Sequence, residues 1–229
     1  MDFLTPSPLV HVQISTYNSC NLSVSSADVT YLEWAGRMGL FDDPSQSSDI
    51  VTAAIAKEND QDFGLCFVPG FHGLTAPATD PLAGAGIIGL APESGKADVL
   101  RAVLESVAFT IKQLEETFER ESNYELRNIQ IDGGVAQNDL VVQTIASLLG
   151  QKVQRAAAKD VGAFGVAFLA GLEGDLWDSV DELCKVRSVE RTFHPESGDS
   201  PRVKKLIQRY GRWCEACRRF SKWHPEEEL

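Results

Sequence analysis

The sequence contains no run of about 18 consecutive apolar residues, so no membrane-spanning helix is expected. Residues 1–10 also lack a basic segment followed by a long apolar stretch, which argues against a secretory signal. Cysteine is scarce, with five residues at scattered positions, a pattern typical of reduced thiols in the cytosol. These absences together predict a cytoplasmic protein.

Metal-ligand spacing is also missing from the sequence. Cys214 and Cys217 are closely spaced, but a structural zinc site would need a second close pair of Cys or His ligands. Of the four histidines, only His224 lies near these cysteines. We therefore expect the two cysteines to be small apolar residues on one face of a helix, with no metal bound.

Basic residues are scarce outside one segment. The net charge of −12 argues against nucleic acid as a partner. Residues 201–223 nevertheless carry eight basic residues and one acidic residue, a net charge of +7, against −19 for the rest of the chain. Apolar residues recur at helical spacing in the same segment. Such a basic amphipathic helix can bind a membrane or calmodulin, but we expect the commoner arrangement, in which its apolar stripe packs on its own domain.

Apolar periodicity predicts a mixture of helices and strands. The 229 residues, 43% of them hydrophobic, are enough for one sizeable domain or two small ones. Helices are expected at 27–40, with Ser25 or Ser26 as N-cap, and at 49–57, 97–120, 139–149, 161–171 and 176–187. Strands are expected at 10–14, 126–132 and 151–155, and at each end of the glycine- and proline-rich segment 64–92. This order predicts an α/β fold in which helices cover a sheet.

One strand-to-helix turn carries the clearest indication of a ligand. The strand at 126–132 leads into Asp132-Gly133-Gly134, and Asn138 precedes the next helix. Two adjacent glycines let the backbone approach a flat or charged ligand closely, and the helix points unpaired N–H groups toward it. Such a turn suggests a nucleotide, although, taken alone, a plain tight turn with Asn138 as an ordinary N-cap is the commoner explanation.

Four segments follow one another in a recognisable order. They are FVPGFHGLTAPATDPLAGAGIIGL at 67–90, its continuation to Glu105, IDGGVAQND at 131–139 and GAFGVAFLAGL at 162–172, with RTFHPE at 191–196 after them. Together they resemble the C-terminal nucleotide-binding lobe of the FGGY carbohydrate kinases, and within that family the glycerol kinases.

This resemblance implies a fold and a division of the chain. The fold would be an α/β, ribonuclease H-like and actin-like ATPase domain at residues 25–197. A poorly matching segment at 1–24 precedes it, and a basic amphipathic helix with an acidic end follows at 198–229. Because residues 1–24 do not match the family clearly, the resemblance leaves open whether the first strands of this domain are present.

The resemblance also implies a binding mode for ATP. Gly133 and Gly134 would pass under the adenosine, and Asn138 would reach the adenine edge. Ser26 and Thr30 would approach the phosphates or the sugar from the other side, at positions where glycerol kinases usually have Gly and Gln. Mg²⁺ would be held mainly by the nucleotide and by the other lobe of the kinase.

The chain contains no Asp-x-Gly-Thr turn, the phosphate-binding motif of the family's N-terminal lobe. That lobe also holds the glycerol or related polyol and the aspartate that acts as base, so we assign no catalytic residue to this chain. We expect the chain alone to be inactive as a kinase. The alternatives are another FGGY sugar kinase, or a non-catalytic fragment that pairs with a full-length kinase or forms a homo-oligomer.

Overall fold

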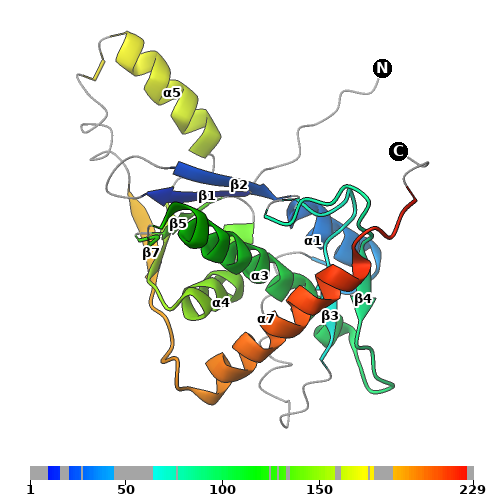
Figure 1. The fold of residues 1–229 in the computed structure, drawn as a ribbon. Coiled ribbons are helices and arrows are strands. Elements are labelled where there is room, and N and C mark those ends of the chain that lie inside the picture. Colours follow the sequence, from blue (N-terminus) through cyan, green and yellow to red (C-terminus); the bar gives the residue numbers. More distant parts are fainter. Residues whose placement is uncertain are drawn as a thin grey trace.

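The computed structural model combines a five-stranded sheet, a two-stranded sheet and several helices (Figure 1). Its mixed helix-and-sheet architecture confirms the predicted α/β class. The residues it describes are 10–15, 21–26, 28–43, 64–75, 77–123, 125–127, 129–132, 135–157, 161–174, 176–177 and 188–225.

The larger sheet has the strand order β2-β1-β5-β6-β7. β1 pairs antiparallel with β2 and β5, β5 pairs parallel with β6, and β6 pairs antiparallel with β7. The parallel pair requires a crossover, which helix α4 (Asp139–Leu149) supplies. This β5–α4–β6 unit places the end of one strand beside the start of a helix. The five strands are β1 (Val10–Ser15), β2 (Asn21–Ser26), β5 (Ile129–Ile131), β6 (Val153–Ala156) and β7 (Val189–Phe193).

The N-terminal part differs from the prediction. The sequence predicted one strand at 10–14, whereas the structure has the hairpin of β1 and β2. Ser25 and Ser26 end β2, so neither is the N-cap of helix α1 (Asp28–Arg37), and that prediction was wrong. β2 has few of the β-branched and aromatic residues that are enriched in strands, so local propensity gave little sign of it. Backbone pairing with β1 is what makes this segment a strand.

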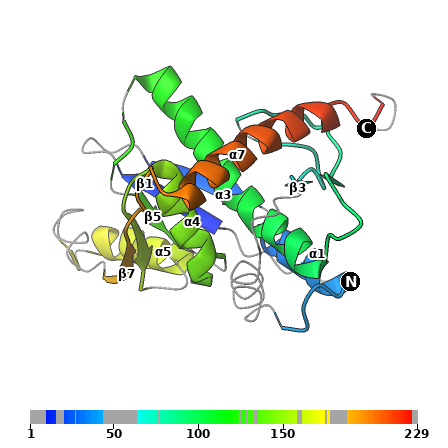
Figure 2. The ribbon, with the colours of Figure 1, turned by 90° about the horizontal axis from the view of Figure 1, so that it is seen from below.

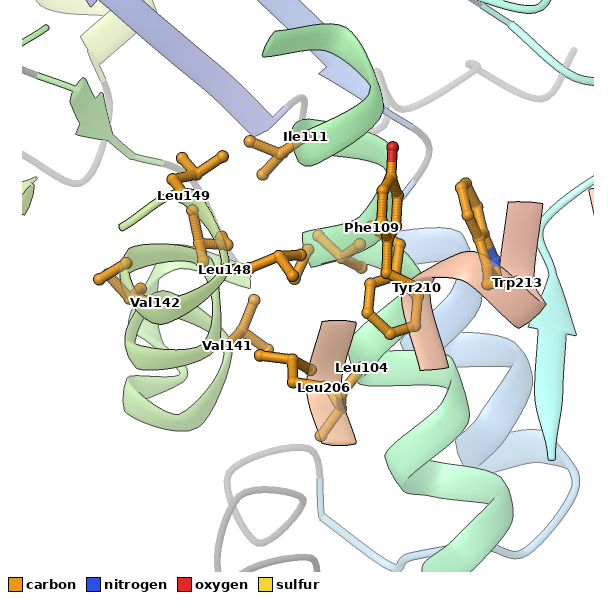
Figure 3. Close-up of a cluster of buried hydrophobic side chains, with 14 of the residues drawn as sticks. Leu104, Phe109, Ile111, Val141, Val142, Leu148, Leu149, Leu206, Tyr210 and Trp213 are labelled. Carbon is orange, nitrogen blue, oxygen red and sulfur yellow. The ribbon is translucent and has the colours of Figure 1, made fainter. Parts of the chain in front are cut away.

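An apolar core lies between α4 and the helices α3 (Lys96–Ser122) and α7 (Pro201–Phe220). Figure 2 shows α3 and α7 crossing, and Figure 3 shows Leu104 of α3, Val141 of α4 and Leu206 of α7 converging. Burial of one such side chain contributes about 1.5–3 kcal/mol. Helix α7 therefore packs its apolar stripe on its own domain, as its pattern predicted.

The two cysteines of the C-terminal segment lie on α7, Cys214 half-buried and Cys217 buried. Burial raises the pKa of Cys217 to about 12, so its thiol stays protonated at neutral pH. Within the part of the chain that the structure describes, no three Cys, His, Asp or Glu side chains are grouped as metal ligands. Likewise, no helix among the described residues is long and apolar enough to cross a membrane.

A second, aromatic cluster lies where α1 meets the smaller sheet. Tyr31 and Trp34 of α1 pack against Phe67 and Phe71, with ring centroids 5.3 to 5.7 Å apart. Two antiparallel strands confirm those expected at the ends of the segment 64–92. They are β3 (Cys66–Val68) and β4 (Gly86–Ile88).

Helix α5 (Val161–Glu173) confirms the helix expected at 161–171 and projects away from the other helices in Figure 1. Its apolar side chains Val166 and Leu169 are 69% and 71% exposed. The helix expected at 49–57 lies outside the described residues. Of the segment 176–187, only 176–177 is described, and it is not helical.

Candidate functional site

The segment between β5 and α4 follows the end of β5, the central strand of the larger sheet. Asp132, directly after β5, is buried. Gly133 and Gly134 lie outside the described residues, so their predicted approach to a ligand stays a prediction. A short 3₁₀ turn (Val135–Gln137) then leads to Asn138. The described residues thus show a buried strand end and, after a 3₁₀ turn, a helix start.

Asn138 is the N-cap of α4. Its backbone is extended, with φ −85° and ψ 105°, and its side-chain oxygen accepts hydrogen bonds from Leu140 N at 3.1 Å and Val141 N at 3.3 Å. These bonds satisfy two of the donors that a helix start leaves unpaired. Because the oxygen serves as the cap, a contact with a base would have to come from the nitrogen of the same amide. Both roles are therefore chemically compatible in one residue.

A buried arginine supports this turn from the neighbouring strand. Arg155 of β6 is 6% exposed, and its Nη1 donates to Ala136 O at 3.0 Å and to Asp139 Oδ1 at 2.7 Å. Its Nε and Nη2 donate to the two carboxylate oxygens of Glu190 on β7, at 3.1 and 3.3 Å. One guanidinium therefore joins the turn, the helix start and two strands.

A second arginine joins this network. Arg191 of β7 donates a second charged hydrogen bond to Asp139. The guanidinium carbons of Arg155 and Arg191 lie 5.4 and 4.6 Å from the ring centroid of Phe193, within cation–π range. Two cations thus face two carboxylates, those of Asp139 and Glu190, at the start of α4.

Arg155 was not predicted as part of the site. One signal was available in the predicted strand at 151–155. Val153 and Arg155 are two residues apart, so they face the same side of the sheet, and both are buried. A charged residue on the buried face of a strand requires charged or polar partners, and such partners belong to a polar site or a structural ion network.

Ser26 and Thr30 belong to β2 and α1, and strand pairing places the end of β2 near the end of β5. The strand register pairs Val24 with Val12, and Val12 with Ile131 of β5. Ser26, the last residue of β2, therefore lies at the same end of the sheet as the end of β5, and β1 lies between these two strands. Thr30 follows in the first turn of α1. Their predicted contacts with phosphate or sugar stay predictions.

The glycine-rich segment 64–92 is ordered against the end of α7. Asp80 accepts hydrogen bonds from Leu82 N at 3.0 Å, from Lys222 N at 2.9 Å and from the Ser221 hydroxyl. The Ser221 bond and the backbone bonds lower the pKa of Asp80. Gly84 leaves no room for a side chain, because an added Cβ would lie 2.8 Å from the Trp223 ring. The segment is thus attached to its own domain through α7.

Comparison with known proteins identifies the family. A family model described as the C-terminal domain of the FGGY family of carbohydrate kinases matches residues 19–173. Homo sapiens glycerol kinase 5 is 34% identical over 218 residues, which are 95% of this chain and 40% of that protein. Glycerol kinase of Pasteurella multocida (strain Pm70) is 36% identical over 165 residues, 72% of this chain and 32% of that protein.

A solved structure supports the same assignment. The structure of Plasmodium falciparum glycerol kinase with ADP superimposes with a TM-score of 0.71 at 29% sequence identity, covering 86% of this chain and 38% of that one. This chain spans between 32% and 40% of the length of the two curated relatives given above. Its actin-like ATPase fold and its family match agree. The chain therefore belongs to the FGGY family of carbohydrate kinases and carries the C-terminal domain of that family.

Proposed function

We propose that this chain is the nucleotide-binding lobe of an ATP-dependent polyol kinase of the glycerol kinase type. The observation that carries the proposal is the β5–α4 turn, with Asn138 at the helix start, in a chain similar to a glycerol kinase solved with ADP. A helix start offers N–H donors and the positive end of a dipole, which suit an anionic nucleotide.

The proposed site consists of residues from two segments, one after β5 and one after β2, at the same end of the larger sheet. Gly133 and Gly134 would pass under the adenosine, and Asn138 would donate from its amide nitrogen to the adenine edge. Ser26 and Thr30 would approach the sugar or phosphates from the side of α1. The strand register supports this grouping, since Ser26 lies two strands from β5 and at the end of the sheet where β5 ends.

The reaction would be the transfer of the terminal phosphoryl group of ATP to an alcohol, glycerol or a related polyol. Phosphoryl transfer depends on positioning and on neutralising charge, and the protein does little covalent work. Mg²⁺ suits this division, because it prefers phosphate oxygens, water and one or two carboxylates. The nucleotide itself and the second lobe would therefore supply most of its ligands.

Binding of ADP by the purified chain tests this proposal. Isothermal titration calorimetry should give a saturable isotherm for ADP and for ATP with Mg²⁺. Adenosine should compete with both, because the proposed turn recognises the nucleoside. Heats that do not saturate for any of the three would contradict the proposal.

The chain alone should not phosphorylate glycerol, because the alcohol site and the base would lie in the other lobe. A coupled assay for ADP release should show the same rate with and without glycerol. The matched control is the chain with Gly134→Val, whose added side chain should block the proposed approach of the adenosine. A glycerol-dependent rate above that control would contradict this prediction.

A second candidate function is that of a non-catalytic interaction module. The exposed apolar side chains of α5, Val166 and Leu169, favour it, because apolar side chains that stand together on a surface mark contact sites. The partner would be a full-length kinase or a second copy of the chain. Co-purification with a full-length FGGY kinase would support this function, and a monomer that binds no kinase would contradict it.

A further inference from the structure

We propose that Arg155 is a positioning residue for nucleotide binding, which holds the chain on both sides of Asn138 in place. The inference rests on the proposed function, because it concerns the turn assigned there to adenosine. Arg155 lies on β6, one strand away from the end of β5, and its side chain is buried. It would act through the backbone and Asp139, without touching the nucleotide.

One nitrogen of Arg155 contacts residues on both sides of Asn138 in the chain. Arg155 Nη1 donates to Ala136 O at 3.0 Å and to Asp139 Oδ1 at 2.7 Å. Ala136 is the middle residue of the 3₁₀ turn and is fully buried, and Asp139 is the first residue of α4. Fixing the positions immediately before and after Asn138 relative to β6 also fixes the side chain between them.

The other side of the guanidinium sets its orientation. Nε and Nη2 donate to Glu190 Oε2 and Oε1 at 3.1 and 3.3 Å, a paired contact that holds the planar group in one direction. The Phe193 ring lies 5.4 Å from the guanidinium carbon. Lysine has a single charged nitrogen, so it cannot hold Glu190 and the turn in the same geometry.

The same network decides the charge at the start of α4. Asp139 in the first turn is favoured by the helix dipole, but an unpaired carboxylate there would repel the phosphates of a nucleotide. Arg155 and Arg191 both bind this carboxylate. Its charge is therefore neutralised, and the helix start keeps its preference for an anion.

Calorimetry with ADP on the full 229-residue chain tests the inference. Arg155→Gln should weaken ADP binding about tenfold or more, since a loosened turn must be ordered again on binding. Arg155→Lys should also weaken it, although the charge is kept. The control is Val103→Ala, a core substitution in the cluster around Phe67, which should lower the melting temperature and leave ADP affinity unchanged.

A double-mutant cycle separates positioning from an independent effect. Asp139→Asn should weaken ADP binding less than Arg155→Gln, because the contact with Ala136 O remains. The double variant should bind ADP no more weakly than Arg155→Gln alone, since both changes break the same connection. Losses that multiply would overturn the inference.

Amide hydrogen exchange without nucleotide separates the failure of this inference from the failure of the proposed function. Arg155→Gln should speed exchange at Leu140 and Val141, and Val103→Ala should not. If the unaltered chain does not bind ADP, the proposed function fails, and exchange alone decides whether Arg155 positions the turn. If the unaltered chain binds ADP and Arg155→Gln binds it equally well, or exchange at the turn is unchanged, the positioning role is overturned and the proposed function stands.

Discussion

Helix α4 is held by two kinds of contact. Along its length, Val142 and Ile145 are buried in the apolar core that also contains Trp213 of α7. At its start, Asp139 lies in a network of charges with Arg155 and Arg191. Apolar burial is not directional and contributes to stability in proportion to area, whereas the guanidinium bonds fix a direction. The core therefore sets how stable the helix is, and the network sets where its first turn lies.

Among these predictions, truncating Trp213 in the core should lower the stability of the protein most. It is 2% exposed, packs against Phe109 and Tyr210, and its Nε1 donates to Phe67 O at 2.9 Å. Trp213→Ala should lower the free energy of unfolding by about 3–5 kcal/mol, measured by urea denaturation. Trp223→Ala is the matched control, because Trp223 is 66% exposed, and it should cost below about 1 kcal/mol. Equal losses of unfolding free energy in the two variants would contradict the distinction between core and surface.

The ion pair of Arg209 with Glu105 tests whether a charge contact inside the core behaves like the network at α4. Both side chains are nearly buried, 13% and 10% exposed, and the two bonds are 2.9 and 2.7 Å. Glu105→Gln should cost about 3 kcal/mol, because it removes one charge of a nearly buried ion pair. Glu215→Gln, which breaks exposed pairs with Arg218 and Arg219, should leave the urea midpoint unchanged. A midpoint shift of similar size in both would contradict this.

Asn138 allows stability and binding to be separated at one residue. Asn138→Ala removes the cap and should cost about 1 kcal/mol. Asn138→Ser keeps a capping oxygen but removes the amide nitrogen, so it should keep the stability and lose ADP affinity. Urea denaturation and calorimetry on both variants check this. If Asn138→Ser bound ADP normally, Asn138 would be a helix cap only.

Asp80 should contribute least to stability, and its contribution should disappear in acid. Its folded-state pKa is lowered from 3.8, chiefly by the hydrogen bond from Ser221. Its contribution is therefore present above about pH 4 and is lost as the pH falls through the lowered value. Asp80→Asn should make the melting temperature depend less on pH between about pH 4 and pH 2. The melting temperatures of the two proteins should become equal at the acid end. A difference that grows with acidity would contradict the assignment.

Much of the fold could be predicted from local pattern. Helix α3 follows the stripe from Leu100 to Phe118, and α4 ends at Gly150, whose φ is 67°. Strand β2 could not be predicted, because it has few β-branched and aromatic residues and pairing with β1 decides its structure. In the site, Asn138 could be predicted from its place before a helix. For Arg155, the alternation with Val153 indicates a buried charge, but its partners Ala136, Asp139 and Glu190 could not be predicted, since they are 16 to 35 residues away along the chain.

Local sequence patterns were enough to predict the family, the α/β class, the C-terminal helix whose apolar stripe packs on the domain, and the helix start at Asn138. These depend on periodicity and on motifs whose residues are close together in the chain. Two features became visible only in the folded chain: Arg155 supports the start of α4, and Asp80 attaches the segment 64–92 to the residues that follow α7. Both depend on side-chain hydrogen bonds between distant segments, and such bonds form only after strand pairing and helix packing have brought those segments together.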